Sequence, residues 1–391
     1  MSSNRSGAPD PGRRSASGSM DTAHVSRMNL DATGQAGPPP NVELWSRDGF
    51  VGDICVVERP EPTFGYTSVS GPHAPHRLGI ADLELPDRDD PSALPVPFMT
   101  SRTGVVLSAS ARRAPTPWAI RNVEADEIHF VQSGELDYVT DFGTITVKAG
   151  DFLHLPRAVT YRVVPLSKDT LTVLIETPEA AKLEPPAPFG MINLATSVQR
   201  PDPARSSALE GETTLLVKSF DGATLFTKPN DPMRIVAHIG GTVPVWKLNL
   251  ADVSPLTYVP HGGPPTHFLH TPSKDVLLYT LSARPGARPP LHHNADYDEV
   301  IFYVGGDAWG RVDEPGTLTW VPKGVTHWGP REDTAGHLSW LLEVGGTLRF
   351  TEAALGKADL METDEYDRHP SVAEKAAGPI TATIQPEQVT R

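Results

Sequence analysis

The sequence has almost no cysteine and no long apolar run. Among 391 residues the only cysteine is Cys55, which excludes an intrachain disulfide framework and a zinc site built from cysteines. No stretch approaches the roughly 20 apolar residues that cross a bilayer. The Ser-, Gly- and Arg-rich beginning also lacks the apolar segment of a secretory signal. We therefore expect a soluble, cytoplasmic protein without a membrane partner.

Basic residues are outnumbered by acidic ones. The chain has 34 Lys and Arg residues against 48 Asp and Glu residues, which gives a net charge of -14. A surface of this charge repels phosphate backbones, so we expect no nucleic-acid partner. The hydrophobic share of 38% is still enough to build a buried core.

Helical periodicity is also scarce, and only residues 351–361 show it. Turn-forming residues are frequent instead, with 40 Pro and 33 Gly. Between them lie short runs rich in β-branched and aromatic residues, such as EIHFVQ, TITVKA, EVIFYV and TLTWVP. Runs of this length and composition between turns are typical of strands. The sequence therefore predicts a nearly all-β chain.

Composition divides the chain into four parts. Residues 1–40 are polar and rich in Pro, Gly and Ser, which predicts a disordered tail, and residues 363–391 predict a flexible one. The strand-like runs lie between these tails. We expect an N-terminal β-barrel over residues 41–185 and a C-terminal one over residues 186–362, with the boundary in the Pro-rich stretch 178–189.

The two halves share one spaced pattern. Glu127 is followed after seven residues by Gly134, and Glu299 is followed after seven residues by Gly306. Later in each half comes a Gly-x5-Pro segment that ends at Tyr161 in the first half and, at identical spacing, at a histidine in the second. Two matched segments in the same order indicate a tandem duplication.

The second half carries the residues of a candidate metal site. The segments that hold His292, Glu299 and His327 resemble the metal-binding motifs of the cupin superfamily, and the resemblance implies that these side chains point from neighbouring strands into one barrel lumen. Two imidazoles and one carboxylate with open coordination positions are typical of non-haem Fe(II) oxygenases, so we expect Fe(2+) as the cofactor. His293 is the alternative to His292, since neighbouring strand residues face opposite sides and only one can ligate. The seven-residue step to the glutamate favours His292.

These segments resemble the two motifs of the cupin superfamily, G-x5-H-x-H-x(3,4)-E-x6-G and G-x5-P-x-G-x2-H. Asn294 stands where the first motif has its second histidine. The resemblance implies two tandem cupin barrels, each a double-stranded β-helix or jelly roll. In the first half Ile120, Asn122 and Tyr161 replace the other ligand positions and only Glu127 remains, so we expect that barrel to be metal-free.

Among cupins with two such barrels, the chain resembles the homogentisate 1,2-dioxygenase family. The resemblance is carried by ELDYVTDFGTITVKAGDFLHLPRAVTYRV, by RPPLHHNADYDEVIFYVGGD with Asn294 inside it, and by the HWGP ending at 327–330. It implies an Fe(II)-dependent, extradiol-type dioxygenase that inserts O2 into a hydroquinone-type aromatic acid, and a homo-oligomer. Val321 departs from the family, which has a histidine six residues before the last ligand, and this leaves the substrate open.

Three alternatives stay open. The first is a dioxygenase for another aromatic substrate of the gentisate or hydroquinone type. The second is a small-molecule-binding protein of the same fold without catalysis. The third is a manganese-dependent decarboxylase, against which Asn294 argues.

The resemblance also directs attention to the histidines of HGGPPTHFLH, residues 261–270. His261 and His267 are the candidates for the base that deprotonates a phenol, a role that the near-neutral pKa of histidine suits. The alternative is that these histidines are simply solvated in a Pro- and Gly-rich loop. Candidate partners of a substrate carboxylate are Tyr297, Tyr303 and Arg288.

Overall fold

The structure is a computed structural model that describes residues 29–30, 36–37, 41–50, 52–183, 192–254, 265–283, 288–331 and 335–370. It confirms the all-β prediction: apart from Pro370, the only helical residues described belong to three-residue 3-10 turns. Residues 351–361 form turns and end in the short strand β26 (Asp359–Leu360). None of the described helices is long and apolar enough to span a membrane.

Most of the two predicted tails lies outside the described residues. The exception is the stretch 363–370, which is packed on the second half of the molecule rather than loose. Thr363 and Tyr366 are fully buried there, and the Tyr366 ring packs edge-on against Trp309 at 4.4 Å between centroids. Ordered structure therefore continues past the predicted start of the C-terminal tail, because this stretch carries apolar anchors within its polar sequence.

Each half contributes one large sheet. The sheet of the first half runs in the order β18 (Trp246–Asn249), β12 (Asp151–Leu155), β9 (Asp126–Ser133), β14 (Leu171–Thr177), β7 (Val106–Ser110), β6 (Val96–Ser101) and β25 (Leu348–Phe350). The sheet of the second half runs in the order β15 (Lys182–Leu183), β19 (Thr266–His270), β20 (Val276–Thr280), β24 (Leu338–Val344), β22 (Asp298–Gly305), β23 (Thr317–Val321), β5 (His76–Gly79) and β26. The two lists correspond when one of them is read backwards: β6, β7, β14, β9, β12 and β18 of the first sheet match β19, β20, β24, β22, β23 and β5 of the second. This shared order of strands agrees with the predicted duplication.

A smaller sheet faces each large one. In the first half it runs β11 (Gly143–Lys148), β10 (Glu135–Thr140), β13 (Thr160–Pro165), β8 (Ala119–Asn122), β16 (Thr213–Ser219) and β17 (Gly222–Lys228). In the second half it has only β21 (His292–Asn294), β3 (Val42–Ser46) and β4 (Ile54–Glu58). A separate pair joins β1 (Asn29–Leu30) and β2 (Ala36–Gly37). The sheets do not join by hydrogen bonds into closed barrels.

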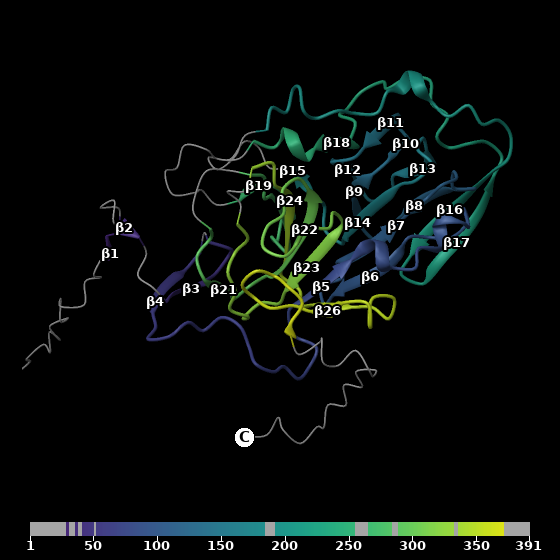
Figure 1. Cartoon of the computed structure of the whole chain (residues 1–391). Coiled ribbons are helices and arrows are strands. Elements are labelled where there is room, and N and C mark those ends of the chain that lie inside the picture. Colours follow the sequence, from purple (N-terminus) through teal and green to yellow (C-terminus); the bar gives the residue numbers. More distant parts are fainter. Residues whose placement is uncertain are drawn as a thin grey trace, which may run out of the picture.

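The two halves exchange strands reciprocally. The hairpin β3–β4 and strand β5 lie at the start of residues 41–185, ahead of the other strands of the first half, but pair with β21 and β23 of the second half. In return, the hairpin β16–β17 and strand β18 pair with β8 and β12 of the first half. Figure 1 shows β5 beside β23, and β3 beside β21. The division at residues 41–185 and 186–362 therefore stays a prediction for the folding units.

The main core lies between the two large sheets. Phe130 of β9 contacts Phe302 of β22 at 5.7 Å and Trp340 of β24 at 5.6 Å between ring centroids, and Phe302 stacks on Trp340 at 4.9 Å. Buried aromatic rings contribute much of the apolar area that stabilises such a core. Since Phe302 faces this core, strand alternation directs Glu299, Ile301 and Tyr303 to the opposite side, into the second half.

Two buried aspartates precede the repeated glutamates and fasten each large sheet. Asp126 and Asp298 each lie beside an aromatic side chain on the next strand and accept two backbone hydrogen bonds. The partners are His154 Nε2 (2.9 Å) and the N–H groups of Arg157 and Ala181 for Asp126, and Trp320 Nε1 (3.2 Å) and the N–H groups of Lys323 and Leu348 for Asp298. In each half, a structural aspartate thus comes directly before the inward-facing glutamate of the repeat.

Candidate metal centre

Three buried side chains meet inside the second half. His292 from β21, Glu299 from β22 and His327 after β23 each offer one ligand atom, and these atoms all lie within 4.8 Å of one another. Of the residues that the structure describes, no other group of three or more His, Cys, Asp or Glu meets this criterion. The two imidazole centroids are 4.3 Å apart. The structure thus brings together the ligand set predicted from the motif spacing.

The backbone fixes the two histidines side by side. The N–H of each donates to the carbonyl of the other, at 3.0 Å for His292 and 2.9 Å for His327. The chain reaches His327 through a turn at Gly324, which has a φ of +78° and whose N–H donates to the Asn294 carbonyl at 2.8 Å. A positive φ favours glycine, which explains this glycine of the motif.

Hydrogen bonds determine the tautomer of both imidazole rings. Nδ1 of His292 is 2.7 Å from the Pro290 carbonyl, and Nδ1 of His327 is 2.9 Å from the Val325 carbonyl. A carbonyl can only accept, so Nδ1 carries the proton and Nε2 of the neutral ring presents a lone pair. This is the usual orientation of a metal-ligating histidine.

The Nε2 atoms face one carboxylate. Nε2 of His327 is 2.6 Å from Glu299 Oε2, whereas Nε2 of His292 is 3.9 Å from Oε1 and has no hydrogen-bond partner among the described residues. Burial raises the pKa of Glu299, but the two histidines outweigh it and hold that pKa far below its usual range. Burial, followed by the neighbouring imidazole of His327, lowers the pKa of His292, which keeps its ring neutral. The donor set therefore fits a cation among the three side chains.

A fourth buried group, Glu343, was not predicted from the sequence. It lies on β24 directly opposite Glu299, and the Tyr279 hydroxyl donates to it at 3.1 Å. Burial, followed by the charge of Glu299, raises its pKa to about 8. No local motif marks this residue, but the duplication does: Glu176 lies opposite Glu127 in the first half in the same way.

The structure separates His292 from its alternative. His293 faces the other side of β21, where its Nδ1 lies 3.0 Å from Glu43 Oε1. Of the two candidate bases, His261 lies outside the described residues. His267 has Nε2 3.0 Å from the Leu269 carbonyl, and its ring packs 4.9 Å from that of Tyr279. His267 is thus one ring away from the hydroxyl that contacts Glu343.

The three predicted carboxylate partners are engaged by the protein itself. Arg288 donates to the Gly329 carbonyl and to Asp364, both at 2.7 Å. The Tyr297 hydroxyl donates to Asp48 at 3.1 Å. The Tyr303 hydroxyl donates to the Gly306 carbonyl at 2.8 Å. Tyr303 does face the interior of the second half, but its polar end is already satisfied.

The equivalent place in the first half is filled by hydrogen bonds. Glu127 accepts from the Tyr161 hydroxyl at 2.7 Å and from Asn122 Nδ2 at 2.9 Å, and His129 Nε2 lies 3.1 Å away. Tyr161 occupies the position of His327, as the repeat predicts. The carboxylate is thus saturated by hydrogen bonds from the protein, and the metal-free first half stays a prediction.

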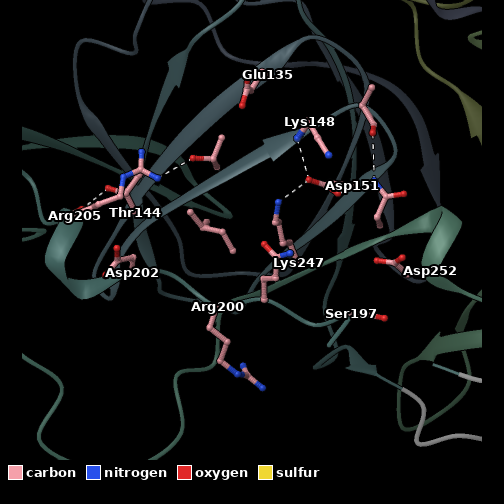
Figure 2. A pocket seen from close by; sticks show the side chains of 15 residues that line it. Glu135, Thr144, Lys148, Asp151, Ser197, Arg200, Asp202, Arg205, Lys247 and Asp252 are labelled. Atoms are coloured by element: carbon pink, nitrogen blue, oxygen red, sulfur yellow. Dashed lines mark hydrogen bonds and ion pairs between the residues drawn. The ribbon is translucent and has the colours of Figure 1, made fainter. Parts of the chain in front are cut away.

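A separate cavity of about 770 Å³ lies on the first half, between β11, β18 and the segment 197–205. Figure 2 shows its lining, in which positive and negative side chains alternate. Arg205 is paired with Asp137 at 2.6 Å and Lys247 with Asp151 at 3.0 Å. None of the three clustered ligands lines this cavity.

Comparison with known proteins supports the resemblance found in the motifs. The chain is 29% identical over 206 residues to a Saccharolobus solfataricus protein named "Putative dioxygenase", which covers 49% of this chain and 52% of that protein. It is 27% identical over 251 residues to a homogentisate 1,2-dioxygenase of Rhodopseudomonas palustris, and the match covers 60% of this chain and 52% of that enzyme. The same enzyme from another strain of that species, BisA53, is 28% identical over 348 residues, which are 80% of this chain and 73% of that enzyme. The predicted resemblance to homogentisate 1,2-dioxygenases is thus confirmed.

The likeness to known proteins is limited in extent. The chain spans about half the length of the first curated relatives that it matches. No family model matches it. Among solved structures, Bacillus subtilis oxalate decarboxylase aligns with a TM-score of 0.38 and 11% identity, over 73% of this chain and 80% of that one.

Proposed function

We propose that the chain is an Fe(II)-dependent, ring-cleaving dioxygenase of the extradiol type that inserts O2 into a hydroquinone-type aromatic compound, with the aromatic acid homogentisate as the reference substrate. One observation carries the proposal. Two imidazole Nε2 lone pairs and one carboxylate converge in a buried place, and this ligand set leaves coordination positions for a substrate and O2. The similarity to enzymes named homogentisate 1,2-dioxygenase supports the same reaction class.

The proposed roles follow from the contacts. His292, Glu299 and His327 would hold the ferrous ion, which when bound supplies adjacent open positions for a phenolate oxygen and O2. The carbonyls of Pro290 and Val325 keep the proton on Nδ1 of each histidine, so that Nε2 stays available. Burial excludes water from the three ligands.

We keep His261 and His267 as the proposed bases for the phenolic proton. The contact of His267 with Tyr279 supports its place near the centre, because the Tyr279 hydroxyl reaches the buried Glu343 beside Glu299. The proposed partners of the protein are a small aromatic substrate and O2, and the resemblance suggests a homo-oligomer.

The test combines metal analysis with oxygen uptake. Protein purified without oxygen should contain close to one iron per chain and should consume one O2 per ring cleaved, and Glu299→Gln should lose both properties. An oxygen electrode and an elemental analysis measure these quantities. Iron-loaded protein that binds dihydroxybenzenes but consumes no O2 with any of them would favour the non-catalytic alternative.

A further inference from the structure

We infer that the ring substrate carries a neutral, apolar substituent, which lies on the inward face of the β3–β4 hairpin, rather than a carboxylate. This inference rests on the proposed function and narrows its substrate class. Two observations support the inference. One is an apolar surface that is continuous with His292, and the other is the set of charged groups around the metal centre.

Strand register places the apolar surface. In the parallel pair of β21 and β3, His292 lies opposite Leu44, and in the antiparallel pair of β3 and β4, Leu44 lies opposite Val56. Residues opposite each other on neighbouring strands point to the same side of a sheet. Leu44 and Val56 therefore extend the face that presents His292 to the metal centre. Figure 1 shows these three strands side by side, with β4 outermost.

Two side-chain contacts confirm the assignment of the faces. The Ser46 hydroxyl donates to Asn294 Oδ1 at 3.4 Å on the His292 side, and Ile54 lies opposite Ser46 on that side. On the other side, Glu43 contacts His293 at 3.0 Å. Even-numbered residues of β3 and β4 therefore face the centre and odd-numbered ones face away.

This face is apolar and open. Val56 is 61% exposed and Ile54 45% exposed, while Leu44 is half-buried. The Phe50 ring lies 4.9 Å from the His292 ring and extends the same surface. Because neighbouring strands are about 4.8 Å apart, Leu44 and Val56 lie roughly 5 and 10 Å from the His292 strand. That is the reach of a short alkyl or aryl group on a ring held at the centre.

The charges around the centre disfavour a carboxylate substituent. The Tyr297 hydroxyl is already held by Asp48, and Glu343, which lies opposite Glu299, offers no positive charge. The nearby cations of the described residues are already paired: Lys274 with Asp48 at 2.6 Å, Arg288 with Asp364 at 2.7 Å and Arg47 with Asp296 at 2.8 Å. A carboxylate here would lose water without gaining an unpaired cation among the described residues, whereas an apolar group would gain contact with Leu44 and Val56.

The inference is tested with three ligands that share one ring: homogentisate, methylhydroquinone and pentylhydroquinone. Binding to the iron-loaded protein is measured by calorimetry without oxygen, and oxygen uptake is measured separately. We expect pentylhydroquinone to bind about tenfold more tightly than methylhydroquinone, because its added methylenes are partly buried. Homogentisate should bind least tightly.

A pair of variants on one strand locates the effect. Val56→Lys places a cation on the inward face and should remove the tenfold gain of the pentyl group while strengthening the binding of homogentisate. Cys55→Lys places the same side chain on the outward face of β4, where Cys55 is exposed, and should leave both unchanged.

The outcomes separate the two proposals. Tighter binding of homogentisate than of pentylhydroquinone by the unaltered protein overturns the inference, and oxygen uptake with homogentisate would still support the dioxygenase. The expected binding order without oxygen uptake overturns the dioxygenase and leaves the inference standing. A third outcome also overturns the inference: Val56→Lys binds all three ligands as tightly as the unaltered protein, and the unaltered protein and Cys55→Lys are dimers whereas Val56→Lys is a monomer. In that case a second copy of the chain, and not the substrate, covers this face.

Discussion

Glu343 lies directly opposite Glu299 on the neighbouring strand, so that two buried carboxyl groups face each other beside two histidines. The histidines keep the pKa of Glu299 far below its usual range, whereas burial and the charge of Glu299 raise the pKa of Glu343 to about 8. One carboxyl is therefore charged and available to a cation while the other holds a proton. A pair with opposite shifts of this kind is more common at functional sites than in ordinary cores.

The pH dependence of stability should report Glu343. In the metal-free protein the folded state keeps the Glu343 proton that the unfolded chain releases above pH ~4.5, so this group makes the free energy of unfolding fall as the pH rises from there to about 8. Glu343→Gln removes that dependence and should be more stable than the unaltered protein at pH 8, by roughly 2–4 kcal/mol. Urea unfolding at three pH values measures it.

The exposed Glu58, on the hairpin strand β4, provides the control for this experiment. Glu58→Gln should leave the difference between pH 5 and pH 8 unchanged. If the stability of Glu343→Gln changed with pH in parallel with that of the unaltered protein, Glu343 would have an ordinary pKa in the folded state.

The two adjacent histidines should differ in their effect on iron. His292→Ala removes a ring whose Nε2 faces Glu299, so iron content should fall by at least tenfold. His293→Ala removes a contact with Glu43 on the opposite face and should lower the iron content much less. Elemental analysis after anaerobic reconstitution measures both variants. Equal losses would show that His293 is a ligand.

Glu43 should affect the metal without ligating it. Glu43 comes from the exchanged hairpin and accepts from Arg59 at 2.5 Å. It also contacts His293 at 3.0 Å and Thr326 at 3.4 Å, which are the chain neighbours of the proposed ligands His292 and His327. Glu43 itself is buried, and Glu43→Ala leaves its half-buried partners without their acceptor, which we expect to cost about 1–3 kcal/mol and to reduce iron content. Thermal unfolding and iron analysis, with Glu58→Ala as the control, measure both effects. Normal iron in a destabilised protein would mean that Glu43 acts on the fold alone.

The ligand set was predictable because it is written in local spacing. His292 and Glu299 are seven residues apart on adjacent inward-facing positions, and the turn at Gly324 determines where His327 falls. The resemblance of this spacing to the cupin motifs, together with the alternation of strand faces, predicted that the three side chains meet, although β21 and β22 belong to different sheets. The same spacing placed Tyr161 at the position equivalent to His327, and the structure shows its hydroxyl donating to Glu127.

The remaining parts of the site depend on pairing over long distances. Glu343 lies 44 residues after Glu299 and only the order of strands makes them neighbours. The hairpin of β3 and β4 joins β21 across about 250 residues of sequence through a parallel pairing, for which no local pattern exists. Polar groups such as Arg288 and Tyr297 looked available in the sequence because their partners, Asp364 and Asp48, are far away in the chain.

The first half offers a test of how much a single ligand can restore. Tyr161→His places an imidazole where His327 stands in the second half, but Ile120 still occupies the position of His292, and Asn122 still donates to Glu127 at 2.9 Å. We expect iron to stay near one per chain, because a carboxylate and one imidazole at that place hold ferrous iron too weakly. The variant should also lose about 1–3 kcal/mol of stability, since it removes a buried phenol ring and the 2.7 Å hydrogen bond to Glu127.

Tyr161→Phe is the matched control for Tyr161→His, because it loses the hydrogen bond but keeps the six-membered ring. Iron rising toward two per chain in Tyr161→His, but not in Tyr161→Phe, would show that His129 completes a site with Glu127 and that the first half has retained more of its metal chemistry than its hydrogen bonds indicate.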